Sequence, residues 1–75
     1  MASISIELSA EMLGKLTELA ERCSEADENA TSHGPLDVVG LLTMLAEDAV
    51  MVIDRPGSWE GSNMATVLTA HGYDV

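Results

Sequence analysis

The chain has very little positive charge. Lys15, Arg22 and Arg55 are its only Lys and Arg residues, against 13 acidic ones. Proteins that hold DNA or RNA rely on Lys and Arg contacts to phosphate, and binding to anionic membranes uses the same side chains. Because three scattered cations cannot supply such contacts, the sequence predicts neither direct nucleic-acid binding nor binding to a membrane surface.

Cysteine is almost absent as well, since Cys23 is the only one. One thiol cannot form an intramolecular disulfide, and together with His33 and His71 it matches no metal-ligand spacing. Cys23 also falls on an apolar helical stripe, where a thiol is inert, and no base or oxyanion-stabilising group accompanies it. The sequence therefore predicts no metal, no cofactor and no catalytic site, so we expect a protein that is not an enzyme.

Signals for export or membrane insertion are also lacking. Residues 1–7 carry neither the basic start nor the long apolar run of a signal peptide. The longest apolar stretch, residues 36–53, contains Asp37, Glu47 and Asp48, which would be costly in lipid. Together with the single cysteine, which suits a reducing compartment, these features predict a cytoplasmic protein of a prokaryotic host cell.

Aromatic residues are scarce, since the chain has one Trp, one Tyr and no Phe, although 47% of its residues are hydrophobic. This composition predicts an aliphatic core. At 75 residues the chain is close to the smallest size at which one core is stable alone. We therefore expect a single domain over residues 1–75, to which dimerisation would add stability.

Residues 10–24 have the clearest helical pattern. Apolar side chains recur there every three or four positions, at Met12, Leu16, Leu19 and Cys23. Ser9 precedes the segment as a predicted N-cap. The other side of the segment holds two oppositely charged i,i+4 pairs in the favourable order, Glu11–Lys15 and Glu18–Arg22. We therefore predict a helix over residues 10–24 that buries its apolar stripe.

The rest of the pattern predicts two strands and two further helices. Residues 3–8 alternate apolar and polar side chains, as a half-buried strand does. Residues 49–54 are rich in β-branched side chains and either continue the preceding helix or form a short strand. We favour the strand, because residues 3–8 need a partner for their backbone groups. The predicted fold is α+β in the order β-α-α-β-α, a two-stranded sheet packed by three short helices: strand 3–8, helix 10–24, helix 35–48, strand 49–54 and helix 59–71.

The acidic side chains form the most informative pattern. The formal net charge of −10 exceeds in magnitude the roughly 2–8 that suits a small domain, and self-repulsion destabilises a compact state. Several carboxylates recur every three or four residues, which in a helix spaces them about 4.5–6 Å apart along the axis. That spacing is loosely comparable to the density of phosphate charges along duplex DNA, which is one charge per about 1.7 Å when both strands are counted. The candidate partner-binding residues are Glu11, Glu18, Glu21, Glu25, Asp27, Glu28, Glu47 and Asp48.

Residues 3–50 resemble a ribbon–helix–helix module. The segment Ser3–Leu8 corresponds to the ribbon, the sequence LGKLTELA lies in the first helix, and an apolar second helix follows. The resemblance implies a homodimer in which two ribbons pair and their outward residues enter the DNA major groove. Here those residues are Ser3, Ser5 and Glu7, none of them basic, and the inter-helix loop over residues 25–34 is longer than the tight turn of that family.

In overall character the chain is similar to small phage-encoded anti-CRISPR proteins that act as DNA mimics, being short and strongly acidic with no active site. This resemblance covers the whole chain. It implies an inhibitor or decoy that binds a basic nucleic-acid-binding site on a protein or nucleoprotein complex, such as a CRISPR effector, and a monomer suits this hypothesis. The alternative is a homodimeric ribbon–helix–helix-like module, of the antitoxin or adaptor kind, that binds another protein.

Overall fold

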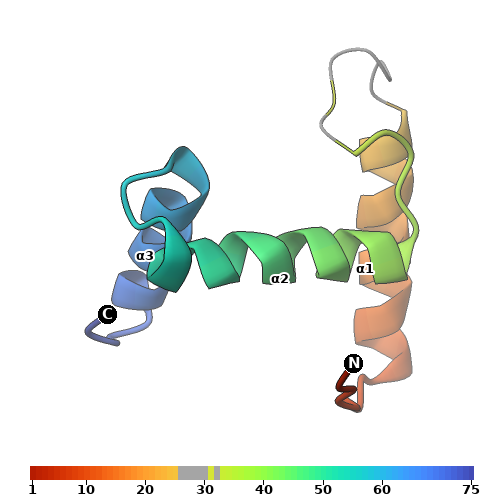
Figure 1. Cartoon of the computed structure of the whole chain (residues 1–75). Coiled ribbons are helices and arrows are strands. Elements are labelled where there is room, and N and C mark those ends of the chain that lie inside the picture. The colour runs from red at the N-terminus through yellow and green to blue at the C-terminus, as the bar shows by residue number, and fades with distance from the viewer. Residues whose placement is uncertain (26–30, 32) are drawn as a thin grey trace. The chain divides into compact units, whose positions relative to one another are not determined.

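The computed structural model describes residues 1–25, 31 and 33–75. In this part of the chain the regular secondary structure consists of three α-helices, α1 (Ala10–Ser24), α2 (Val38–Asp54) and α3 (Trp59–Ala70) (Figure 1). The chain divides into two compact units, Met1–Leu41 and Leu42–Val75, so the boundary falls within α2. No helix of the described residues is long and apolar enough to cross a lipid bilayer.

The predicted α+β fold is wrong, because the described residues form helices and no strand. Residues 49–54 continue α2, and the Arg55 N–H still donates to the Met51 carbonyl at 2.9 Å. Each residue added to a helix gains a hydrogen bond worth about 0.5–1.5 kcal/mol, whereas the low helix propensity of Val or Ile costs at most about 0.7 kcal/mol. Residues 3–8 therefore have no strand beside them in the described chain and form no sheet.

The bounds predicted for the helix over residues 10–24 are confirmed by α1, but its apolar stripe is not fully buried, since Met12 and Leu19 are exposed. Ser9 is its N-cap, with an extended backbone and a hydroxyl that accepts from the Met12 N–H at 3.1 Å. Such a cap satisfies one of the free N–H groups of the first turn and is worth about 1 kcal/mol. The N-terminal start of this helix was therefore predictable from the local sequence alone.

The other two helices differ from their predicted bounds, α2 at both ends and α3 at its last residue. α2 begins at Val38 and not at residue 35, because the Asp37 carboxylate accepts from the Gly40 N–H at 2.7 Å and so caps the first turn. α3 begins after Ser58, whose hydroxyl accepts from the Gly61 N–H at 3.1 Å. It ends before Gly72, whose φ of 91° lies in the left-handed region that glycine tolerates.

Within the unit Met1–Leu41, the hydroxyl of Ser24 joins the end of α1 to the segment that leads into α2. Its oxygen accepts from the Leu36 N–H at 2.8 Å and lies 2.9 Å from the carbonyl oxygens of both Leu36 and Ala20. A hydroxyl has one proton, so these two carbonyls share it. Residues twelve positions apart in the sequence are thereby held together by one side chain.

Within the unit Leu42–Val75, α3 approaches the C-terminal end of α2 closely at Gly61. Gly61 is buried, and a Cβ atom placed on it would lie 2.7 Å from the carbonyl oxygens of Met51 and Arg55. Ser58 closes the turn between the helices, since its N–H and its hydroxyl both donate to the Arg55 carbonyl, at 3.0 and 2.7 Å. Backbones approach this closely only where the intervening residue has no side chain.

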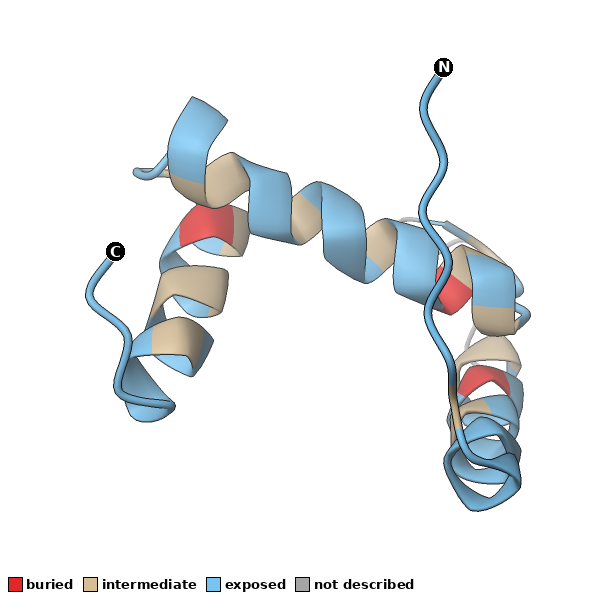
Figure 2. Cartoon of the chain, turned by 90° about the horizontal axis from the view of Figure 1, so that it is seen from below, coloured by how far each residue is buried: buried red, intermediate tan, exposed pale blue. Residues whose placement is uncertain are grey.

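Few residues of the described chain are buried (Figure 2). Ala20 and Leu41 are the buried hydrophobic residues among them. The expected aliphatic core is correspondingly small, and many large apolar side chains are exposed instead, including Ile4, Ile6, Met12, Leu13, Leu19, Val39, Leu42, Leu45, Val50 and Ile53. Where such residues are contiguous on one surface, they can mark a site of interaction.

Candidate partner-binding surface

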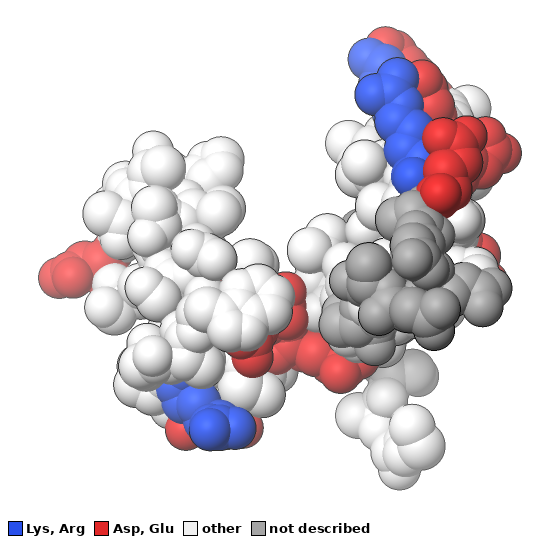
Figure 3. Space-filling model, turned by 90° about the horizontal axis from the view of Figure 1, so that it is seen from above, with Lys and Arg blue, Asp and Glu red and all other residues white. Residues whose placement is uncertain are grey.

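Two of the predicted site residues, Glu11 and Glu18, lie beside the basic residues of the same helix. Glu11 Oε1 is 3.1 Å from Lys15 Nζ, and Glu18 Oε1 is 2.7 Å from Arg22 Nη2, which confirms both predicted pairs. In Figure 3 blue basic and red acidic side chains lie next to one another at the upper right. The four side chains, hereafter the charged ridge, are between 60% and 79% exposed. Exposed pairs contribute only about 0–1 kcal/mol, but here the cations offset the charge of two candidate carboxylates.

Glu21 and Glu25 are the remaining described candidates of the first unit. Both are exposed, and neither forms an ion pair with a described residue. They are four positions apart, so two like charges occupy neighbouring turns, which costs about 0.2–0.5 kcal/mol. At about 100° per residue they lie on the side of α1 opposite to its apolar stripe. We call this pair the acidic edge.

Glu47 and Asp48 belong to the other unit and lie in the middle of α2. Glu47 is exposed and Asp48 is half-buried, and neither forms an ion pair with a described residue. Asp27 and Glu28, also predicted to bind a partner, lie outside the described residues. The predicted acidic surface therefore separates into the partly neutralised charged ridge, the acidic edge, and a pair of carboxylates in the second unit.

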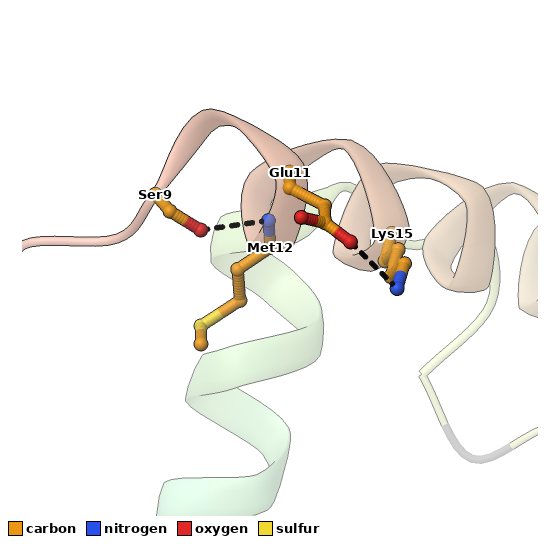
Figure 4. A network of polar contacts seen from close by, with 4 residues as sticks. All are labelled: Ser9, Glu11, Met12 and Lys15. Carbon is orange, nitrogen blue, oxygen red and sulfur yellow. Dashed lines mark hydrogen bonds and ion pairs between the residues drawn. The ribbon is translucent and has the colours of Figure 1, made fainter.

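An apolar groove on α1 runs beside the charged ridge and was missed as a functional candidate by the sequence analysis. Its walls are formed by Ser9, Glu11, Met12, Lys15, Leu16 and Leu19. Met12 is 50% and Leu19 is 45% exposed, and Leu16 is half-buried. Figure 4 shows the Met12 side chain pointing away from the Glu11–Lys15 pair. The helical periodicity of these residues identified an apolar face correctly, but periodicity does not say whether a face is covered by its own chain.

Other reactive groups of the described chain are not gathered into a site. Cys23 is a half-buried free thiol, and no three His, Cys, Asp or Glu side chains in the described part are placed to hold a metal ion. His71 is the C-cap of α3, where its N–H donates to carbonyls of the last turn, and His33 is exposed. Glu60 Oε1 in the first turn of α3 is buried without a hydrogen-bond partner. These groups suggest no shared chemistry.

The surface of the described residues thus offers two features suited to binding a macromolecule. One is the acidic edge, and the other is the apolar groove with its charged ridge. Both lie on the outside of one short helix, where a partner can reach them. The chain matches no protein-family model, and neither a curated protein nor a solved structure is detectably similar to it.

Proposed function

We propose that the protein is a non-catalytic inhibitor that binds a basic, nucleic-acid-binding site on a partner protein or nucleoprotein complex. The observation that carries the proposal is the acidic edge, since Glu21 and Glu25 are exposed and no described cation offsets them. Their Cα atoms are separated by about 6 Å along the helix axis, a spacing at which Lys and Arg side chains of a phosphate-binding cleft can meet both. Occupying such a cleft excludes DNA from it.

This mode of action is that of a DNA mimic of the anti-CRISPR type, and a CRISPR effector in a prokaryotic cytoplasm is one complex with a suitable cleft. Glu47 and Asp48 provide further carboxylates in the second unit. Glu11 and Glu18 contribute less to the proposed interaction, because Lys15 and Arg22 lie within 3.1 Å of them. Glu21 and Glu25 are therefore the carboxylates of α1 on which the proposed interaction mainly depends.

The proposal is tested by identifying the partner and then asking whether DNA competes for it. Affinity capture from a prokaryotic lysate with mass spectrometry gives the candidate, and fluorescence anisotropy gives its Kd with and without duplex DNA. We expect DNA to displace the protein and added salt to weaken binding, because the screening length falls from about 10 Å at 0.1 M to about 3 Å at 1 M. Simultaneous binding of DNA and protein would refute the mimicry.

A matched pair of variants locates the contact. Glu21→Gln with Glu25→Gln should weaken binding by about tenfold or more, equivalent to about 1.4 kcal/mol. Glu7→Gln with Asp74→Asn removes the same charge at two other exposed positions and should leave the Kd nearly unchanged. Equal effects of the two double variants would mean that net charge and not the acidic edge determines affinity.

A second function is favoured by a separate observation, the exposure of apolar residues in the first unit. Ile4 and Ile6 are 87% and 73% exposed, and the groove of α1 is open. A homodimeric interaction module of the antitoxin or adaptor kind would cover such surfaces. Light scattering coupled to size exclusion separates the two functions, because the module requires a stable dimer whereas the decoy works as a monomer.

A further inference from the structure

We infer that two copies of this chain associate through α1 in antiparallel orientation, with the apolar groove of one helix packed against that of the other. The inference rests on the second proposed function, for which it names the partner and the geometry. Its failure would leave the acidic-edge proposal standing, since the two surfaces lie on opposite sides of α1.

The apolar stripe of α1 has the spacing of a helix–helix seam. Met12, Leu16 and Leu19 are separated by four and then three residues, and Cys23 follows after four more. This alternation of four and three keeps apolar side chains on the line along which two helices pack. In the described chain Met12 and Leu19 are about half exposed, whereas Leu16 and Cys23 between and beyond them are half-buried, so the seam is open at Met12 and Leu19.

The charged ridge alternates in sign along the helix in the order Glu11, Lys15, Glu18, Arg22. In an antiparallel pair related by a two-fold axis, the ridges of both copies lie on the same side of the seam and run in opposite directions. An axis that passes between the two helices, level with the midpoint of Lys15 and Glu18, places Glu11 against Arg22 of the second copy, and Lys15 against its Glu18. Every charge of the ridge then meets an opposite charge.

This self-complementarity identifies a second copy, and not an unrelated protein, as the occupant of the groove. A two-fold interface requires a surface patch to be complementary to a second copy of itself. The charge order of the ridge meets this requirement, because reversing it places each acidic residue opposite a basic one. A parallel pair does not, because it puts the two ridges on opposite sides of the seam. The antiparallel arrangement also keeps Glu21 and Glu25 away from the interface, so the least compensated charges of α1 do not face one another.

Engineered disulfides test both the association and its direction. In a Cys23→Ser background, Leu16→Cys lies next to the two-fold axis and faces its counterpart in the second copy. Met12→Cys lies four to five residues from the axis, so its two copies are about 13 Å apart along the helices, beyond the Cα separation of about 4.4–6.8 Å that a disulfide allows. Mild oxidation should therefore yield a covalent dimer of the Leu16→Cys chain and none of the Met12→Cys chain.

Two further measurements keep the test decisive. The unmodified chain should sediment as a dimer, and Leu19→Glu should convert it to a monomer with an unchanged circular-dichroism spectrum, because Leu19 is 45% exposed within one chain. A monomeric wild type would refute both the inference and the dimeric module. A wild-type dimer that crosslinks through Met12→Cys, or through neither position, would refute the antiparallel geometry while leaving the module in place.

Discussion

Gly61 is the position at which a single methyl group should have the clearest effect on folding. A Cβ atom there would lie 2.7 Å from the Met51 and Arg55 carbonyl oxygens, closer than real side chains approach. Both contacts are with backbone, so they are relieved only by moving α3 away from the end of α2. Overpacking of this kind costs about 1–3 kcal/mol, and the better helix propensity of Ala returns up to about 1 kcal/mol.

The expected result for Gly61→Ala is therefore a net destabilisation of up to about 3 kcal/mol, which lowers Tm by about 4–8 °C per kcal/mol in a domain of this size. Thermal unfolding followed by circular dichroism measures it. Gly14→Ala is the matched control, since nothing lies within 4 Å of a Cβ at this exposed position of α1. The control should raise Tm, because Ala stabilises a helix by up to about 1 kcal/mol relative to Gly. A Gly61→Ala chain that melts at or above the wild-type temperature would refute the close approach of the two helices.

Two further predictions concern the first unit. Ser24→Ala leaves the Leu36 N–H without its partner and should lower the free energy of unfolding by about 1–3 kcal/mol in urea titrations; an unchanged titration midpoint would contradict the bridging role of the hydroxyl. Leu41→Ala should cost about 2–5 kcal/mol, since Leu41 is 3% exposed, whereas Val39→Ala, at 73% exposed, should change stability by less than about 0.5 kcal/mol. Equal losses for the two variants would show that Leu41 is not a core residue.

Features that depend on neighbours in the sequence were predictable. The start of α1 at Ser9 and the pairs Glu11–Lys15 and Glu18–Arg22 are decided by residues within one turn of each other. Residues 49–54 show where this local information fails. Their β-branched side chains favour a strand, but a strand requires a partner, and extending α2 satisfies the same backbone groups without one.

The candidate site was predictable only in part, for a similar reason. The sequence identifies the acidic residues and the pairs that offset Glu11 and Glu18, but only the structure shows that the apolar groove beside these pairs is not covered by the described chain. Predicting close helix packing from the positions of glycines is limited in the same way. Gly14 and Gly40 lie inside helices and so predict close helix packing, yet Gly14 faces open space and Gly40 meets only its neighbours Leu36 and Asp37. The close approach occurs at Gly61, whose partners Met51 and Arg55 belong to the preceding helix and turn.

The alternating segment at residues 3–8 has a consequence for the colloidal behaviour of the protein. Ile4 and Ile6 are largely exposed, and no strand of the described chain pairs with them. A segment of this kind can add to copies of itself without limit, and repulsion between chains of net charge −10 opposes that growth. Added salt screens the repulsion and leaves the apolar attraction intact. Turbidity should therefore increase with ionic strength, and the acidic residues then have a second role as a barrier to fibrous assembly.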